Sequence, residues 1–114
     1  MGVRKVDLLQ GTLDLLILKC LSTDANHGYG IAMRLHQLSD DALKVEEGSL
    51  YPALYRMEEQ GLIESEWRST ENNRKAKFYK LTRKGRHAVQ AELDAWLRLS
   101  GAVTRVLRAI EQGA

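Results

Sequence analysis

Residues 47–86 constrain the fold of this 114-residue chain more than any other stretch. They begin as a helix that carries the chain's only proline, Pro52, and continue directly into an alternating hairpin rich in cations. Residues 68–86 contain eight basic residues and one acid, Glu71, so this stretch is formally +7 within a chain of net charge +2. The remainder therefore sums to −5. Positive charge concentrated on one hairpin after a short helix indicates a polyanionic partner, and nucleic acid is the first candidate.

Three helices are predicted ahead of the hairpin. Residues 12–22 and about 29–38 place apolar side chains at helical spacing, with a polar turn between the two segments. The third helix has Ser49 as its expected N-cap, which leaves Pro52 in the first turn, where a missing N–H is tolerated. Gly61 is its expected C-cap.

Two strands are predicted at residues 64–69 and 76–81, because both alternate and the second contains Phe78 and Tyr79. Three helices followed by a two-stranded wing form the winged helix-turn-helix order, a mainly α fold of the α+β kind. We expect residues 1–81 to form this DNA-binding domain and residues 82–114 to form a C-terminal dimerisation helix.

The third helix is expected to bury one side and present the other. Leu50, Leu54 and Met57 lie on the predicted core side. The outward side carries hydroxyls and a guanidinium, which can meet phosphates or base edges in a major groove. Its members are Ser49, Tyr51, Tyr55 and Arg56, of which Arg56 is the leading candidate contact and Ser49 has the simpler alternative role of a cap.

The hairpin tip is expected to grip nucleic acid through Arg74, Lys75 and Lys77. Long cationic side chains near phosphates release condensed counterions, which favours binding without reading sequence. The alternative is a solvated surface that only keeps the protein soluble. A charge of +7 on an otherwise acidic chain favours contact with nucleic acid.

A long helix is predicted from Arg83 to about Glu111, after Thr82 as its N-cap. Apolar residues recur there with a period of seven, which is typical of a helix that packs on a partner helix. Homodimerisation is the simplest source of that partner. The predicted interface consists of Val89, Leu93, Trp96, Leu99, Val103, Val106 and Ile110. Trp96 is either interface core alone or one wall of a flat apolar slot that stacks an aromatic ligand.

Other classes of protein find little support. Cys20 is the single cysteine, expected to be a buried thiol, and a reducing cytoplasm fits this usage. The histidines have no metal-ligand spacing, so neither a metal nor another cofactor is expected. No nucleophile–base pair or phosphate loop stands out, so we do not expect an enzyme. The apolar run at residues 13–21 is too short to span a bilayer, and no membrane partner is expected.

The chain resembles the PadR family of bacterial transcriptional regulators over roughly residues 8–90. The resemblance rests on GTLDLLILKCL, HGYGIAMRL, EEGSLYPALYRMEEQGLI and ENNRKAKFYKLTRKGR. It implies a homodimer that binds palindromic operators on double-stranded DNA, usually as a repressor, and is released by a small molecule or other signal. The family's DNA contacts fall on Ser49, Tyr51 and Pro52, with wing contacts around Arg74, Lys75 and Lys77.

The last helix resembles only the short subclass of that family, in which one helix replaces a larger C-terminal domain. Some short members take flat hydrophobic or phenolic compounds near the dimer interface, which gives Trp96 a possible ligand role here. We therefore predict a cytoplasmic, homodimeric, sequence-specific repressor. The alternatives are a winged-helix module that docks an acidic protein, and a nonspecific nucleoid or RNA-binding protein.

Overall fold

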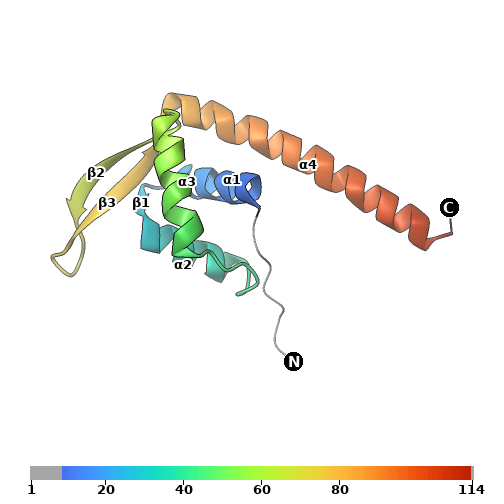
Figure 1. Cartoon of the computed structure of the whole chain (residues 1–114), viewed down its shortest axis with the longest axis horizontal. Coiled ribbons are helices and arrows are strands. Elements are labelled where there is room, and N and C mark those ends of the chain that lie inside the picture. Colours follow the sequence, from blue (N-terminus) through green and yellow to red (C-terminus); the bar gives the residue numbers. More distant parts are fainter. Residues whose placement is uncertain (1–8, 114) are drawn as a thin grey trace.

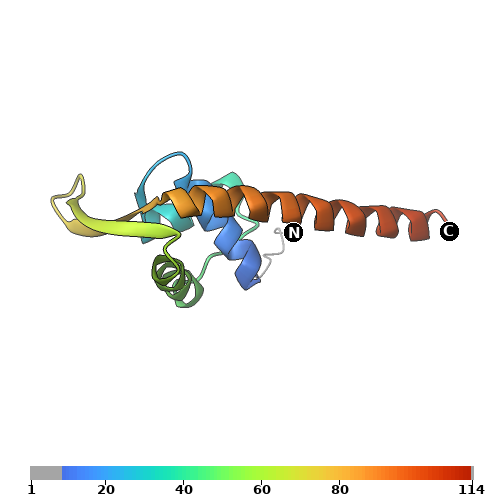
Figure 2. The ribbon, with the colours of Figure 1, turned by 90° about the horizontal axis from the view of Figure 1, so that it is seen from above.

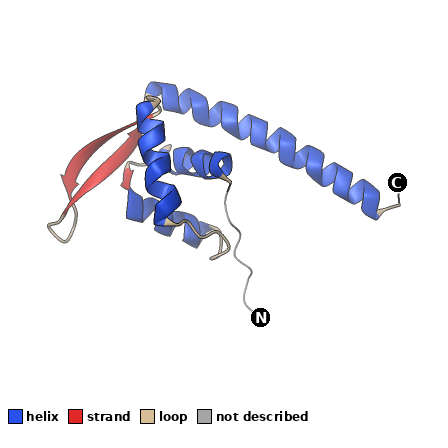
Figure 3. Ribbon diagram, viewed as in Figure 1, coloured by secondary structure: helices blue, strands red, loops and turns tan. Residues whose placement is uncertain are grey.

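Four helices and three strands follow one another in the computed structural model, which describes residues 9–113 (Figures 1 and 3). Residues 1–8 and 114, which the two predicted domains include, lie outside the described residues. The elements are α1 (Gln10–Leu21), β1 (Asn26–His27), α2 (Gly28–Leu38), α3 (Glu47–Glu59), β2 (Ile63–Ser69), β3 (Lys75–Leu81) and α4 (Arg83–Glu111). The winged helix-turn-helix prediction is confirmed.

Helix α1 lies at the centre of the core and packs against α2, α3, α4 and β3. Its buried apolar residues occupy more than one side of the helix, and Ile17 and Leu18 are almost completely buried. Cys20 is also buried, as predicted. Burial raises the pKa of its thiol, an effect that nearby Arg34 partly offsets. The thiol therefore stays neutral and acts as a packing group.

Helix α3 begins at Glu47, so the prediction that Ser49 is its N-cap is wrong. The carbonyl of Glu46 already accepts hydrogen bonds from the backbone N–H groups of Ser49 and Leu50, at 3.0 and 2.9 Å. Pro52 consequently stands inside the helix, where it removes one donor near the exposed start. At the other end the C-cap is Gln60, one residue before the predicted Gly61, and Gly61 follows it with φ +75°, the left-handed backbone that ends many helices.

The wing is an antiparallel sheet of three strands in the order β1-β3-β2. Trp67 lies opposite Lys77, and Ser65 lies opposite Tyr79. The two-residue strand β1 pairs with β3 and was not predicted, because Asn26 and His27 carry no strand-like alternation. It anchors the start of α2 to the wing.

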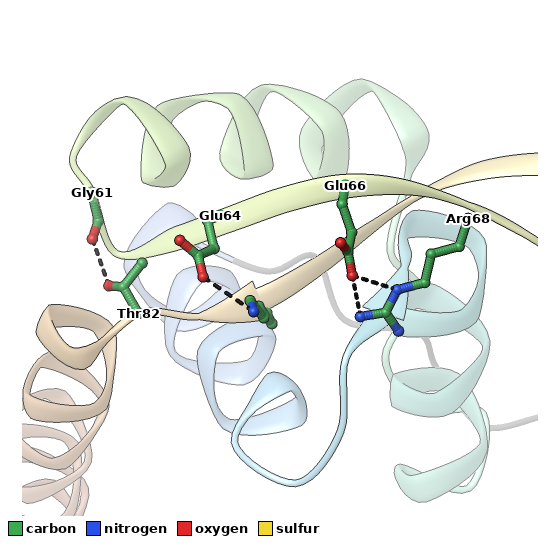
Figure 4. A network of polar contacts seen from close by, with 6 residues as sticks. Gly61, Glu64, Glu66, Arg68 and Thr82 are labelled. Atoms are coloured by element: carbon green, nitrogen blue, oxygen red, sulfur yellow. Dashed lines mark hydrogen bonds and ion pairs between the residues drawn. The ribbon is translucent and has the colours of Figure 1, made fainter.

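The joint between wing and α4 is tightly built. Thr82 caps α4 as predicted: its Oγ1 accepts from the Gly85 N–H at 3.0 Å. The same hydroxyl donates to the carbonyl of Gly61 at 2.6 Å (Figure 4). A Cβ on Gly85 would lie 2.0 Å from the carbonyl oxygen of Leu62, so only glycine fits at this approach. These contacts fix the direction in which α4 leaves the domain.

Helix α4 and the wing extend in opposite directions from the helical body (Figures 1 and 2). The molecule is accordingly elongated, with extents of 59 × 38 × 22 Å. Between residues 9 and 113 no helix combines the length and apolarity needed to cross a membrane. The same residues bring together no group of three or more His, Cys, Asp or Glu side chains suited to a metal ion.

Candidate nucleic-acid interface

Helix α3 divides into a buried and an exposed side, as its pattern predicts. Leu50, Leu54 and Met57 are almost completely buried in the core. Tyr51 and Tyr55 are 46% and 69% exposed. Ser49 and Pro52 are exposed as well, in the N-terminal half of the helix. Ser49, Tyr51 and Tyr55, which are expected to face a major groove, are therefore accessible, and so is Pro52.

Tyr51 is held in place by the start of α2. A Cβ built on Gly28 would lie 2.8 Å from Cε1 of the Tyr51 ring and 2.9 Å from its hydroxyl oxygen. The phenol therefore lies against backbone that only a glycine leaves open. Gly28 is the first residue of α2, and His27 caps the helix by accepting from the Gly30 N–H at 3.0 Å. The exposed tyrosine is thus braced by a rigid helix start.

Arg56 does not point outward from α3, which corrects the orientation predicted from its helical position. Its Nη2 donates to both carboxylate oxygens of Asp14 on α1, at 2.6 and 2.7 Å. Both side chains are largely covered, at 31% and 23% exposed. A helical wheel cannot locate a carboxylate 42 residues away in sequence. Arg56 ties α3 to α1, and DNA contact by this residue stays a prediction.

The two faces of the wing differ in what they carry. Alternation places Ile63, Ser65, Trp67 and Ser69 of β2 on one face, with Lys75, Lys77, Tyr79 and Leu81 of β3 opposite them. We call this the inner face, because it turns toward α3: Ser65 Oγ donates to Glu58 of α3 at 2.6 Å. The outer face carries Glu64, Glu66, Arg68, Ala76, Phe78 and Lys80.

Cations on the outer face are matched by acids. Lys80 Nζ lies 3.4 Å from Glu64 Oε1, and Arg68 Nε donates to Glu66 Oε1 at 2.7 Å (Figure 4). Arg68 also lies over the ring of Phe78. The formal charge of +7 on residues 68–86 therefore overstates the positive charge that the wing presents, because Glu64 and Glu66 lie just outside that segment. The cationic surface of the wing is its inner face and its tip.

At the tip Thr70 and Arg74 close a turn, with an N–H···O distance of 2.7 Å from Thr70 to the Arg74 carbonyl. Arg74 and Lys75 are exposed there, as predicted. Lys77 lies within β3, as it does in the predicted strand at residues 76–81, and its Nζ is 3.6 Å from Glu58 Oε1. It also lies 5.8 Å from the centre of the Tyr79 ring. Of the three predicted wing cations, Arg74 and Lys75 therefore lie at the tip, and Lys77 lies closer to α3.

Helix α4 uses its predicted seam in two ways. Val89 is only 9% exposed and belongs to the core of its own domain, and Leu93 packs against that core. Both residues pack on their own domain because the first turns of α4 lie over it, and their contact with a partner helix stays a prediction. The rest of the seam is 42–65% exposed: Trp96, Leu99, Val103, Val106 and Ile110.

An open groove of about 320 Å³ lies between α1 and α4. Trp96 and Leu99 line it from α4, and Leu15 lines it from α1. Glu92 adds a carboxylate at the same place. This groove is where the predicted ligand residue lies.

Known proteins share both the sequence pattern and this architecture. The model of the Transcriptional regulator PadR-like family matches residues 17–91. The chain belongs to the PadR-like family. A crystal structure of a PadR-like transcriptional regulator from Bacillus cereus is 31% identical, with a TM-score of 0.75, over 87% of this chain and 94% of that one.

Two further structures extend the comparison. A PadR family transcription regulator from Clostridium difficile is 28% identical, with a TM-score of 0.71, covering 83% of this chain and 97% of that one. A Streptococcus mutans protein at 20% identity has a TM-score of 0.80 over 90% and 92% of the two chains, and it supports the fold alone. The PadR-family chain is a DNA-binding transcriptional regulator and not an enzyme.

Proposed function

We propose that this PadR-family protein is a homodimeric repressor that binds a palindromic operator and is released by a small-molecule or other signal. The observation that carries the proposal is the apolar face of α4, which the described residues 9–113 leave exposed beyond Leu93. A regulator of this kind acts in the cytoplasm, on the chromosome.

The dimer is supported by the geometry of that face. At about 100° per residue, six of the seven large apolar side chains that are exposed on α4 fall within a sector of about 100° around the helix axis, and Leu97 falls outside it. The six are Trp96, Leu99, Val103, Val106, Leu107 and Ile110. Arg98 and Arg105 fall on the opposite side of the helix. A stripe this wide is covered well by a second copy of α4 together with its neighbouring helix, and a two-fold axis supplies both.

DNA contact is supported by the accessible side of α3 and by the wing. Ser49, Tyr51, Pro52 and Tyr55 would enter the major groove, while Arg74, Lys75 and Lys77 would hold flanking phosphates. In a dimer, two copies of α3 would reach successive major grooves about 34–36 Å apart. We assign Arg56 to bracing α3 through Asp14.

Release is supported by the groove beside Trp96. A flat aromatic or hydrophobic effector would stack on the indole, and a second α4 would close the groove over it. A bound effector would then change the angle between the two copies of α4 and so the spacing of the two α3 helices. Affinity for a half-site would change little, whereas affinity for the full palindrome would fall.

The experiment selects duplexes from a random pool by gel retardation at physiological salt and then sediments the protein with the selected duplex. Recovery of a palindrome bound by two chains supports the proposal. Equal retardation of every duplex would indicate nonspecific nucleoid or RNA binding. No retardation of any duplex, together with binding to acidic proteins, would favour the interaction module.

A further inference from the structure

We propose that Trp67, on the inner face of the wing, is a DNA-contacting residue that packs its indole against the sugars of the groove next to the one occupied by α3. This inference deepens the proposed function and rests on it. The alternation of β2 puts Trp67 on one face of the wing but does not say which face meets a partner.

Trp67 stands among cations. It lies directly opposite Lys77 in the β2–β3 ladder, and Lys75 is the next residue toward the tip on the same face. Its side chain is 67% exposed. A single exposed apolar residue is ordinary in proteins. An exposed indole with two lysines beside it on the same face of the sheet is a more specific arrangement. It suits a partner that is anionic and partly apolar.

The inner face is continuous with the accessible side of α3. Tyr51, Tyr55 and Glu58 are spaced four and three residues apart, so they form one stripe along that helix. Glu58 touches the wing twice, through Ser65 at 2.6 Å and Lys77 at 3.6 Å. The stripe that carries the exposed tyrosines therefore borders the face that carries Trp67. A duplex lying along α3 would meet the indole without any change in the protein.

The outer face offers no such surface. Its Arg68 and Lys80 already have Glu66 and Glu64 as partners, and the carboxylates would repel phosphates (Figure 4). The two acids and two cations of the outer face sum to zero, whereas the strands contribute Lys75 and Lys77 and no acid to the inner face, where Glu58 of α3 lies beside Lys77. Charge complementarity selects the inner face, and double-stranded DNA is the polyanion that a PadR-family regulator binds.

The chemistry separates Trp67 from its neighbours. Lysines on phosphates release counterions, so their contribution falls steeply with salt. An indole on deoxyribose carbons buries apolar surface, and its contribution is nearly independent of salt. Trp67→Ala should therefore weaken binding to a duplex selected by the parent protein about tenfold or more, as expected for truncating an aromatic anchor, while the salt slope stays unchanged.

The first measurement is the affinity for that duplex between about 50 and 200 mM salt, the range in which phosphate contacts are most evident. Trp67→Phe should keep most of the affinity. The control is the double variant Glu66→Gln/Arg68→Gln, which keeps the net charge and alters only the outer face; it should bind as the parent does. Thermal unfolding of each variant separates lost contact from lost folding.

The second measurement uses the chain's two tryptophans. Emission of the parent should be quenched or shifted when the duplex is added, and Trp67→Phe, which keeps only Trp96, should lose most of that change. Equal affinity of Trp67→Ala and parent, or the same emission change in Trp67→Phe, would overturn this inference and leave the repressor proposal intact. A parent that binds no duplex would instead sink the repressor proposal.

Discussion

Helix α3 and the second half of α4 are both amphipathic, but among residues 9–113 only α3 has its apolar side covered. Leu50, Leu54 and Met57 of α3 are almost completely buried. Val103 and Val106 of α4 remain about half exposed. The same kind of residue pattern therefore serves folding in one helix and, in our proposal, assembly in the other.

This difference has a thermodynamic consequence. Contacts made within the chain stabilise the protomer at any concentration, whereas contacts between copies follow mass action. Substitutions in α3 should therefore act independently of protein concentration, and substitutions in the second half of α4 should depend on it.

Leu54→Ala should lower the free energy of unfolding by about 2–5 kcal/mol, because it leaves a cavity in a fully covered site. Denaturant unfolding at two widely separated protein concentrations would show the same loss at both. Val106→Ala is a smaller truncation on α4, and its effect should shrink as the protein is diluted. A Val106→Ala loss that is equal at both concentrations would contradict the contrast.

Trp96→Ala should raise the dissociation constant of the homodimer about tenfold or more, because it truncates the largest side chain of the exposed seam. Sedimentation equilibrium measures this directly. Arg105→Ala, on the opposite side of α4, should leave the constant nearly unchanged. A Trp96→Ala protein as tightly dimeric as its parent would remove Trp96 from the interface.

Local signals in the sequence were enough for much of the fold. The predicted α4, from Arg83 to about Glu111 behind a Thr82 cap, agrees with the structure, because capping and periodicity are local properties. Strand β1 was missed since it exists only through its pairing with β3. The cap at Ser49 was wrong because the backbone of Glu46 starts the helix without any side-chain cap.

The candidate interface was less accessible to sequence reasoning than the fold. Tyr51 and Tyr55 could be placed outward by helical spacing alone. The partners of Arg56 and Lys77, by contrast, are carboxylates on other elements, which no local pattern reveals. Trp67 could be selected as a candidate DNA contact only from the structure, because the contact between Ser65 and Glu58 shows which face of the wing turns toward α3.

The ion pair between Arg56 and Asp14 tests whether α3 is braced from its own chain. A double-mutant cycle of Arg56→Ala and Asp14→Ala should give a coupling of about 1 kcal/mol in the free energy of unfolding, as for a partly exposed pair. The salt dependence of DNA binding should keep its slope in Arg56→Ala. A slope reduced by about one, with stability unchanged, would make Arg56 a phosphate contact instead.

Substitutions of Lys75 and Lys77 should have the smallest effects on DNA binding, and the two effects should differ, because only Lys77 has a carboxylate beside it. Lys75 is exposed at the start of β3, whereas Lys77 lies 3.6 Å from a Glu58 oxygen. Lys75→Ala should weaken binding to all duplexes alike and reduce the salt slope by about one. Lys77→Ala should act in the same direction but less, because its charge is shared with Glu58.

Lys80→Ala, on the outer face, is the control with little expected effect. Unchanged affinity in both Lys75→Ala and Lys77→Ala would show that the inner face of the wing does not grip the backbone.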